Sequence, residues 1–172
     1  MTVIVGIADG DKVYIGGDRA ASDGDSIISM SRPKVGVRGD WIYGYSGDIG
    51  IGQYLDVIDL PILKDNDDPY MVIINELIYT LHERIDKIIN NDEPQADFLI
   101  GAKGRLFEIS TEAWGVVEVN ESSIGSGSQF ALGSLYTTYN YTIPIEERVE
   151  LAINAAITYS PSCQGPIDIL YL

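Results

Sequence analysis

Short blocks of β-branched and aromatic residues alternate with turn residues over the first third of the chain. Thr2–Ala8 and Lys12–Gly17 are rich in Val, Ile and Tyr, and Asp9-Gly10-Asp11 between them is typical of a hairpin turn. Residues 34–37 and 41–46 form a second pair of the same kind, again joined across a glycine. The chain is therefore expected to begin with antiparallel β-structure.

A helical period replaces this pattern near residue 71. Apolar side chains recur there at steps of three and four, which places them on one face of a predicted helix. That face consists of Met71, Ile74, Ile78, Leu81, Ile85 and Ile88. A shorter helix is predicted over Ile49–Asp59, with Pro61 close to its end, and the acidic residues 65–69 are expected to form a solvated loop.

The second half of the chain repeats this order. Strands are predicted at Phe98–Ala102, Leu106–Ser110 and Val116–Val119, followed by a helix at Ser128–Tyr139. A second helix carries the apolar stripe Ile145, Val149, Ala152, Ile153, Ala156 and Ile157. Pro166–Leu172 is expected to close the chain as a strand.

Two antiparallel sheets packed face to face, with a helix layer outside each, satisfy this order and bury every apolar face. The predicted fold class is therefore α+β, a four-layer αββα sandwich. A length of 172 residues suits one domain, and neither an internal repeat nor a linker divides the chain. Residues 1–172 are expected to form a single domain.

Charge and composition narrow the range of partners and locations. The formal net charge is -15 at pH 7, and such a surface repels a nucleic-acid backbone and an anionic membrane, so neither is expected as a partner. The one cysteine, Cys163, cannot form an internal disulfide, which favours a reducing compartment. The N-terminus lacks the features of a signal peptide, and no apolar stretch is long enough to span a bilayer. We expect a soluble, cytoplasmic protein.

The sequence has few of the residues that common catalytic and metal-binding sites require. His82 is the one histidine, and it lies inside the predicted long helix, where nothing marks it as part of a Ser-His-Asp site. One histidine and one cysteine cannot make a typical zinc site. Gly125-Ser126-Gly127-Ser128 lacks the third glycine of a dinucleotide-binding loop. Neither a metal nor a cofactor is expected.

A different chemistry is available at the N-terminus. Thr2 follows Met1, and an initiator methionine is commonly cleaved before so small a residue. Thr2 would then carry a hydroxyl and a free α-amine, whose unperturbed pKa is about 8. It could supply nucleophile and general base together, without a histidine. Many proteins begin Met-Thr, so the surrounding residues decide the weight of this hypothesis.

Three segments stand at characteristic spacings near this end of the chain: Thr2-Val3-Ile4-Val5-Gly6, Gly16-Gly17-Asp18-Arg19-Ala20 and Pro33-Lys34-Val35. They resemble, without a gap, the opening of HslV and proteasome β-subunits, which are N-terminal-nucleophile (Ntn) hydrolases. Gly44-Tyr45-Ser46-Gly47 is similar to that family's strand-end glycine segment, and Ile124-Gly125-Ser126-Gly127-Ser128 to its Gly-Ser-Gly turn. Gly165-Pro166-Ile167-Asp168-Ile169-Leu170 resembles the closing strand of small phage and bacterial HslV-like proteins.

The resemblance implies an αββα sandwich and a threonine endopeptidase with Thr2 as nucleophile. A protonated Lys34 close to Thr2 would favour the alkoxide, and Asp18 would pair with Lys34 and aim it. The Gly47 N–H would face the developing oxyanion, and Ser126 would hydrogen-bond near the amine and help relay its proton. Without the resemblance, the charged pair would be a stabilising ion pair between strands and Ser126 a turn or cap serine. Both alternatives remain open.

One departure from the family concerns its last helix, where an aspartate precedes a serine by three residues. Ser162 matches the serine, but Tyr159 stands where the family has the aspartate. A phenol brings no negative charge at neutral pH. The departure bears on the proton relay more than on the nucleophile.

The family also implies partners: a homo-oligomeric ring that encloses the active sites, peptides or unfolded proteins as substrates, and a separate AAA+ unfoldase. The unfoldase must be another protein, because this chain carries no nucleotide-binding loop. Two other functions are open. A non-catalytic assembly subunit is favoured by Tyr159 and by retention of Met1, and a different Ntn amide hydrolase is compatible with the same scaffold.

Overall fold

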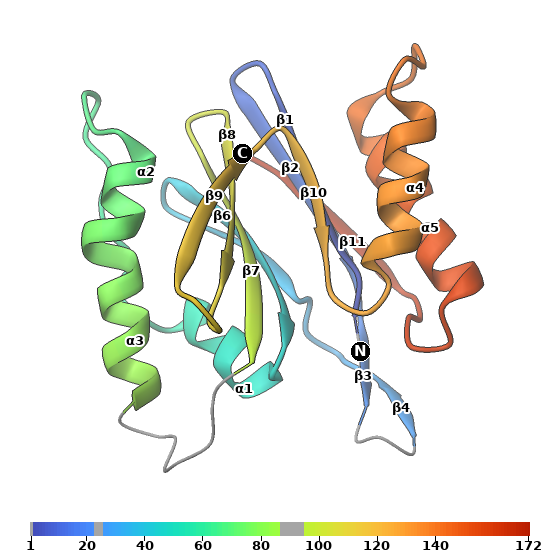
Figure 1. The fold of residues 1–172 in the computed structure, drawn as a ribbon, viewed down its shortest axis with the longest axis horizontal. Coiled ribbons are helices and arrows are strands. Elements are labelled where there is room, and N and C mark those ends of the chain that lie inside the picture. The colour runs from blue at the N-terminus through green and yellow to red at the C-terminus, as the bar shows by residue number, and fades with distance from the viewer. Residues whose placement is uncertain (1, 23–25, 87–94) are drawn as a thin grey trace.

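Two antiparallel sheets pack face to face, and each is covered on its outer side by helices (Figure 1). The computed structural model describes residues 2–22, 26–86 and 95–172. The first sheet has the order β10 (Glu121–Ile124), β1 (Ile4–Asp9), β2 (Lys12–Asp18) and β11 (Ile167–Tyr171). The second has the order β5 (Val35–Arg38), β6 (Trp41–Gly47), β7 (Ala96–Ala102), β8 (Arg105–Ser110) and β9 (Gly115–Val119). The four-layer αββα sandwich expected from the sequence is confirmed.

Alternation along β1 decides which side chains enter the space between the sheets. Ile4 belongs to the inter-sheet core, whereas Val3 and Val5 face the helices on the outer side. The inter-sheet core consists of Ile4, Val13, Ile15, Val35, Ile42, Leu99, Leu106 and Ile124. Thr2 has the same parity as Ile4. Its side chain therefore lies at the end of the inter-sheet layer, and Thr2 is 3% exposed.

Helices α4 (Ser128–Thr138) and α5 (Ile145–Tyr159) cover the first sheet, on the right in Figure 1. The predicted stripe of α5 is confirmed, because Val149, Ala152, Ile153 and Ala156 are all fully buried. Arg148 is buried beside them and is neutralised by Glu121 on β10, at 2.8 Å. Its guanidinium also donates to the Leu135 carbonyl near the end of α4. The charge is therefore paired and hydrogen-bonded, as burial requires.

The long helix expected over the other sheet is present but is not uniform. It comprises α2 (Pro69–Val72), a π-helical turn (Ile73–Leu77) and α3 (Ile78–Asp86). Leu81 and Ile85 are buried as predicted, but Met71 and Ile74 are 50% and 39% exposed. The π-helical turn inserts one extra residue, so Val72 and Ile73 occupy the buried face instead. Ile88, the last residue of the predicted stripe, lies outside the described residues.

Some short elements were not predicted. β3 (Ala20–Ser22) pairs with β4 (Ile27–Ser29), and β10 was not expected as a separate strand. The short helix predicted after β6 is split into α1 (Ile49–Gly52) and a 3-10 turn. Among the described residues, no helix has the length and apolar character needed to cross a membrane.

Candidate active site

Three buried polar side chains meet where β1 and β2 approach the second sheet. Lys34 Nζ donates to Thr2 Oγ1 at 2.7 Å and to Asp18 Oδ1 at 2.7 Å. It also donates to the carbonyl of Ala20 at 2.6 Å. Lys34 is 1% exposed and Asp18 is fully buried. The structure therefore brings together the three residues that the sequence placed in one cluster.

Burial and pairing with Asp18 have opposite effects on the pKa of Lys34. Burial lowers the pKa of Lys34 below its usual value, and the adjacent Asp18 carboxylate opposes this shift without cancelling it. An ammonium has three N–H donors, and the three acceptors around Nζ match that number. The protonated form therefore fits the site, and in that form Lys34 cannot take a proton from Thr2.

Asp18 is held by backbone N–H groups from several segments. Its carboxylate accepts from Val3 N at 3.1 Å, from Ala20 N at 3.3 Å and from Gln164 N at 3.0 Å. These donors fix the orientation of the carboxylate towards Lys34. Asp18 thus ties the start of β1 to the chain that follows α5.

The Gly-Ser-Gly turn encloses Thr2 from the other side. Gly125 has a φ of +91°, and a Cβ built on it would lie 2.4 Å from the Thr2 carbonyl oxygen, so no larger residue fits. The Gly127 N–H donates to that same oxygen at 3.1 Å. The Thr2 N–H donates to Ser126 Oγ at 3.1 Å. Both the nitrogen and the carbonyl of Thr2 are therefore fixed by one turn.

A chain of serine hydroxyls extends from this turn into the protein. Ser126 Oγ lies 2.9 Å from Ser162 Oγ, and Ser162 Oγ lies 2.7 Å from Ser160 Oγ. Ser126 and Ser162 were predicted, but Ser160 was not. Ser160 ends α5, because Pro161 follows it and disfavours a helical conformation at the preceding residue. The Ser-Pro-Ser spacing at a helix end was the signal that could have identified it.

Comparison with known proteins shows the family to which the chain belongs. No protein-family model matches the chain. Proteasome subunit beta 1 from Thermococcus kodakarensis is 31% identical over 162 residues, which cover 90% of this chain and 78% of that protein. The chain belongs to the proteasome β-subunit and HslV-like family of Ntn hydrolases.

Solved structures of more distant Ntn hydrolases share the fold. BPH from Thiobacillus denitrificans in complex with epoxomicin has a TM-score of 0.80 at 20% identity, covering 99% of this chain and 98% of that one. HslV from Trypanosoma brucei has a TM-score of 0.72 at 19% identity and covers 99% of each chain. These likenesses extend over the whole sandwich, including the strands and turns around Thr2.

Gly47 lies across a groove from the Gly-Ser-Gly turn of this Ntn hydrolase. It has a φ of +86°, and a Cβ built on it would lie 2.1 Å from the Gln95 carbonyl oxygen. Glycine is therefore required by both backbone conformation and space. Gly47 and Thr2 line the same groove. The five predicted site residues other than Thr2 therefore lie near Thr2 or belong to the chain of serine hydroxyls that begins at Ser126.

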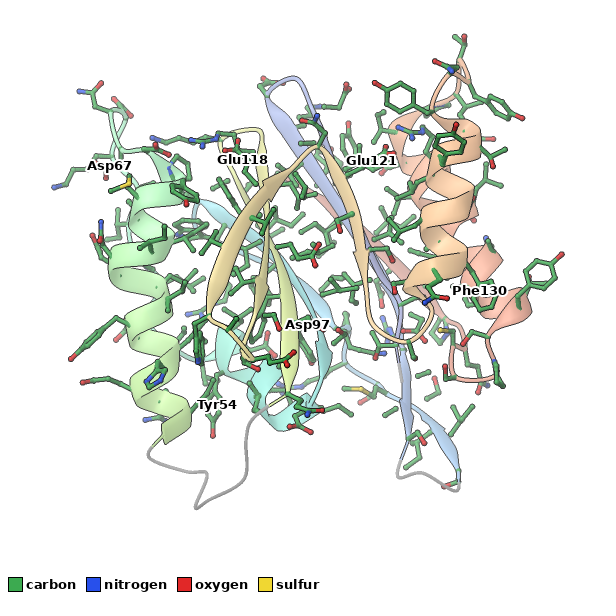
Figure 2. All side chains as sticks on the ribbon, in the orientation of Figure 1. Tyr54, Asp67, Asp97, Glu118, Glu121 and Phe130 are labelled. Carbon is green, nitrogen blue, oxygen red and sulfur yellow. The ribbon has the colours of Figure 1, made fainter. Side chains whose placement is uncertain are left out.

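Three other residues considered from the sequence have different surroundings. Tyr159 is 70% exposed, and its ring lies 6.1 Å from that of Phe130 on α4, which Figure 2 labels. His82 is on the surface of α3, with its ring 5.2 Å from Trp114. Cys163 is buried next to the serine chain, and burial raises the pKa of its thiol. Met1, whose removal was predicted, lies outside the described residues.

Arg19 also supports the site, although the sequence did not single it out. Its guanidinium forms a two-pronged pair with Asp168 on β11, with both contacts at 2.6 Å, and donates to the Ser31 carbonyl at 2.7 Å. The arginine therefore links the closing strand to the segment that precedes Lys34. Both residues lay within segments matched to the family, but only the packing of β11 against β2 shows that they meet.

Proposed function

We propose that this chain is a threonine peptidase whose nucleophile is Thr2 after removal of Met1. Members of the family to which it belongs are threonine peptidases. The observation that carries the proposal is the contact of Thr2 Oγ1 with the buried Lys34 ammonium, which Asp18 holds in place. A structural ion pair alone would not need a hydroxyl as the third member of the cluster.

The proposed reaction begins with a proton transfer within Thr2. The free α-amine accepts the hydroxyl proton, while Lys34 stabilises the negative charge that develops on Oγ1. Oγ1 attacks the peptide carbonyl carbon, and the Gly47 N–H is assigned to the resulting oxyanion. The C–N bond then breaks, and the leaving amine takes the proton held by the α-ammonium.

The second half-reaction releases the product. The acyl part of the substrate is then bound to Thr2 Oγ1 as an ester. A water molecule attacks the ester carbonyl while the α-amine accepts a proton from that water. Collapse of the second tetrahedral intermediate returns the proton to Oγ1 and frees the carboxylic acid product. No ionisable side chain other than Lys34 has to contact the reacting atoms.

Ser126, Ser162 and Ser160 are proposed to orient the α-amine. Ser126 Oγ accepts the N–H of Thr2, so the hydroxyl chain behind it fixes how the amine lone pair is directed. Ser160 supplies a hydrogen-bonding group to Ser162, although Tyr159 provides no carboxylate. This role is one of positioning, because Ser160 does not touch Thr2.

Replacing Ser160 with alanine is expected to lower kcat/KM for peptide substrates by about tenfold, because Ser162 loses its 2.7 Å partner and Ser126 becomes less well oriented. The pH profile of kcat/KM should shift as well, since the environment of the amine changes. Ser160→Thr keeps the hydroxyl and should restore both properties. An unaltered pH profile in a folded, slower Ser160→Ala protein would contradict the positioning role.

Removal of Met1 is expected to switch the protein on without changing its fold. With Met1 attached, the Thr2 nitrogen is an amide without useful basicity, whereas the strand contacts of β1 begin after it. Incubation of both forms with epoxomicin, an epoxyketone that captures hydroxyl and amine together, should add its mass to the Met1-free form only. Circular dichroism should be the same for the two forms.

The same experiment separates the alternative functions. Labelling of the Met1-bearing form at Thr2 would overturn the amine mechanism. A Met1-free protein that neither labels nor hydrolyses peptides would support a non-catalytic assembly subunit. A protein that labels but cleaves only small amides would support a different Ntn amide hydrolase.

Assembly and partners are part of the proposal. A homo-oligomeric ring of this chain would enclose the Thr2 sites, and a separate AAA+ unfoldase would deliver unfolded protein to them. A cytoplasmic location is consistent with the single buried thiol of Cys163. Light scattering of the purified protein tests the oligomer directly.

A further inference from the structure

A groove of about 850 Å³ runs along the end of the sandwich beside Thr2. One wall is formed by Thr2 and the turn at residues 123–126, and the other by the ends of β6, β7 and β8. Because Thr2 lines this groove, a peptide bound in it could bring its carbonyl to Thr2 Oγ1. The inference drawn from it rests on the function proposed above.

Strand parity directs two carboxylates into this groove. On β7, Asp97 has the same parity as Leu99, which belongs to the inter-sheet core. On β8, Glu108 pairs with Leu99 in the ladder and shares its face. Figure 2 shows Asp97 on β7, in the region between the two sheets. Both side chains therefore face the same space as Thr2.

The charge of the groove has one sign. Its lining includes Asp48, Asp97, Glu108 and Glu112, and no lysine, arginine or histidine of the described residues lines it. Two of these carboxylates have neutral partners: Asp48 accepts from Gln95 N at 3.2 Å, and Glu108 accepts from Ser122 Oγ at 2.6 Å. In the described part of the chain none of the four is paired with a cation. A low-dielectric cleft lined by one sign of charge attracts ligands of the opposite sign.

A second, independent observation indicates that the groove receives a polar ligand. Ser46 lines the groove and is only 2% exposed, and its hydroxyl has no hydrogen-bond partner within the described residues. It lies against the turn that holds Thr2, because a Cβ built on Gly125 would be 3.2 Å from Ser46 Cβ. Buried hydroxyls are almost always hydrogen-bonded, and an unsatisfied one costs free energy. A ligand that reaches Ser46 would satisfy it.

We infer that the groove selects peptides carrying a lysine or arginine close to the scissile bond, with Asp97 and Glu108 as the specificity-determining residues. The positive side chain lies between the two carboxylates, and Ser46 hydrogen-bonds a polar group of the bound peptide. Glu112 and Asp48, both exposed, contribute attraction at the rim. An acidic peptide is repelled by the same four groups.

The experiment compares matched fluorogenic peptides that differ only in the residue before the cleaved bond: lysine, norleucine or glutamate. With the Met1-free protein, kcat/KM should fall in that order, with about tenfold or more between lysine and glutamate. The ratio should shrink as the salt concentration rises from about 0.1 to 1 M, because screening shortens the reach of the carboxylates. Asp97→Asn and Glu108→Gln should each lower the lysine-to-glutamate ratio severalfold.

Glu150→Gln is the matched control, since it removes one negative charge from the exposed face of α5 and should leave the ratio unchanged. Binding of the same peptides to the Thr2→Ala variant, followed by fluorescence polarisation, reports the charge preference without turnover. Equal binding and equal cleavage of the lysine and glutamate peptides would overturn the inference while leaving the peptidase proposal intact. A preference for lysine in binding, with no cleavage of any peptide by the Met1-free protein, would support the inference and overturn the peptidase proposal.

Discussion

In the Met1-free protein, Thr2→Ala is expected to abolish peptide hydrolysis, with kcat/KM reduced by at least about 10³-fold. The variant keeps the α-amine and the Lys34–Asp18 pair, but it lacks the oxygen that Lys34 Nζ contacts at 2.7 Å. No other hydroxyl or thiol contacts the lysine ammonium among the described residues. Hydrolysis of a fluorogenic peptide and covalent labelling by epoxomicin would both be measured.

Thr2→Ser is the matched control for this variant. Serine keeps the hydroxyl, the amine and the contact with Lys34, so labelling should persist. Thr2→Ser should unfold at a temperature close to that of the parent protein, whereas Thr2→Ala removes one acceptor of the buried Lys34 ammonium and should unfold at a somewhat lower temperature while still folding. Residual activity of Thr2→Ala well above background would mean that another residue is the nucleophile, and the N-terminal mechanism would have to be abandoned.

Lys34→Ala is expected to lose activity almost as completely. Without the ammonium, charge on Thr2 Oγ1 is unsupported, and Asp18 is left as a buried, unpaired carboxylate. Breaking a buried pair in this way destabilises a protein by about 3–5 kcal/mol. The expected result is therefore a loss of kcat/KM of at least about 10³-fold together with a lower midpoint of denaturant unfolding. Activity is measured well below that midpoint.

Two further variants complete the comparison. Asp18→Asn keeps the size of the side chain and one acceptor oxygen but removes the charge that holds Lys34, and its NH2 group faces backbone N–H donors, so both activity and stability should fall. Lys64→Ala removes an exposed lysine from a loop and should change neither property. The double variant Thr2→Ala with Lys34→Ala should be no less active than Thr2→Ala alone, because residues that act as a unit are non-additive. A much larger loss in the double variant would show that the two residues act separately.

The pairing of Asp18 with the start of the chain could be predicted from local sequence. The Gly10 turn fixes the register of the β1–β2 hairpin, in which Ile4 lies opposite Gly17. Asp18 must then lie beside residue 3, and its carboxylate accepts the Val3 N–H. A two-strand hairpin with a short turn allows little other geometry.

The helix over the second sheet shows where periodicity was insufficient. Steps of three and four correctly placed Leu81 and Ile85 in the core, but the π-helical turn moved Met71 and Ile74 to the surface. The pattern assumed a constant 3.6 residues per turn. The π-helical turn is an irregularity that a constant residue count cannot reveal, and within it Ile73 and Leu77 are the residues that join the core over the second sheet.

By itself, the sequence determined the class of the fold, the opening hairpin and the identity of the residues around Thr2, because alternation, turn residues and motif spacing are properties of the chain. Only the tertiary structure decided which of those residues meet. Lys34 reaches Thr2 through the face-to-face packing of the two sheets, Ser160 reaches Ser162 through the turn after α5, and Asp97 and Glu108 face the groove through the register of β7 and β8. Each of these contacts depends on how the sheets, the strands and the turn after α5 are placed in space. That placement is set by packing, which involves all the layers at once.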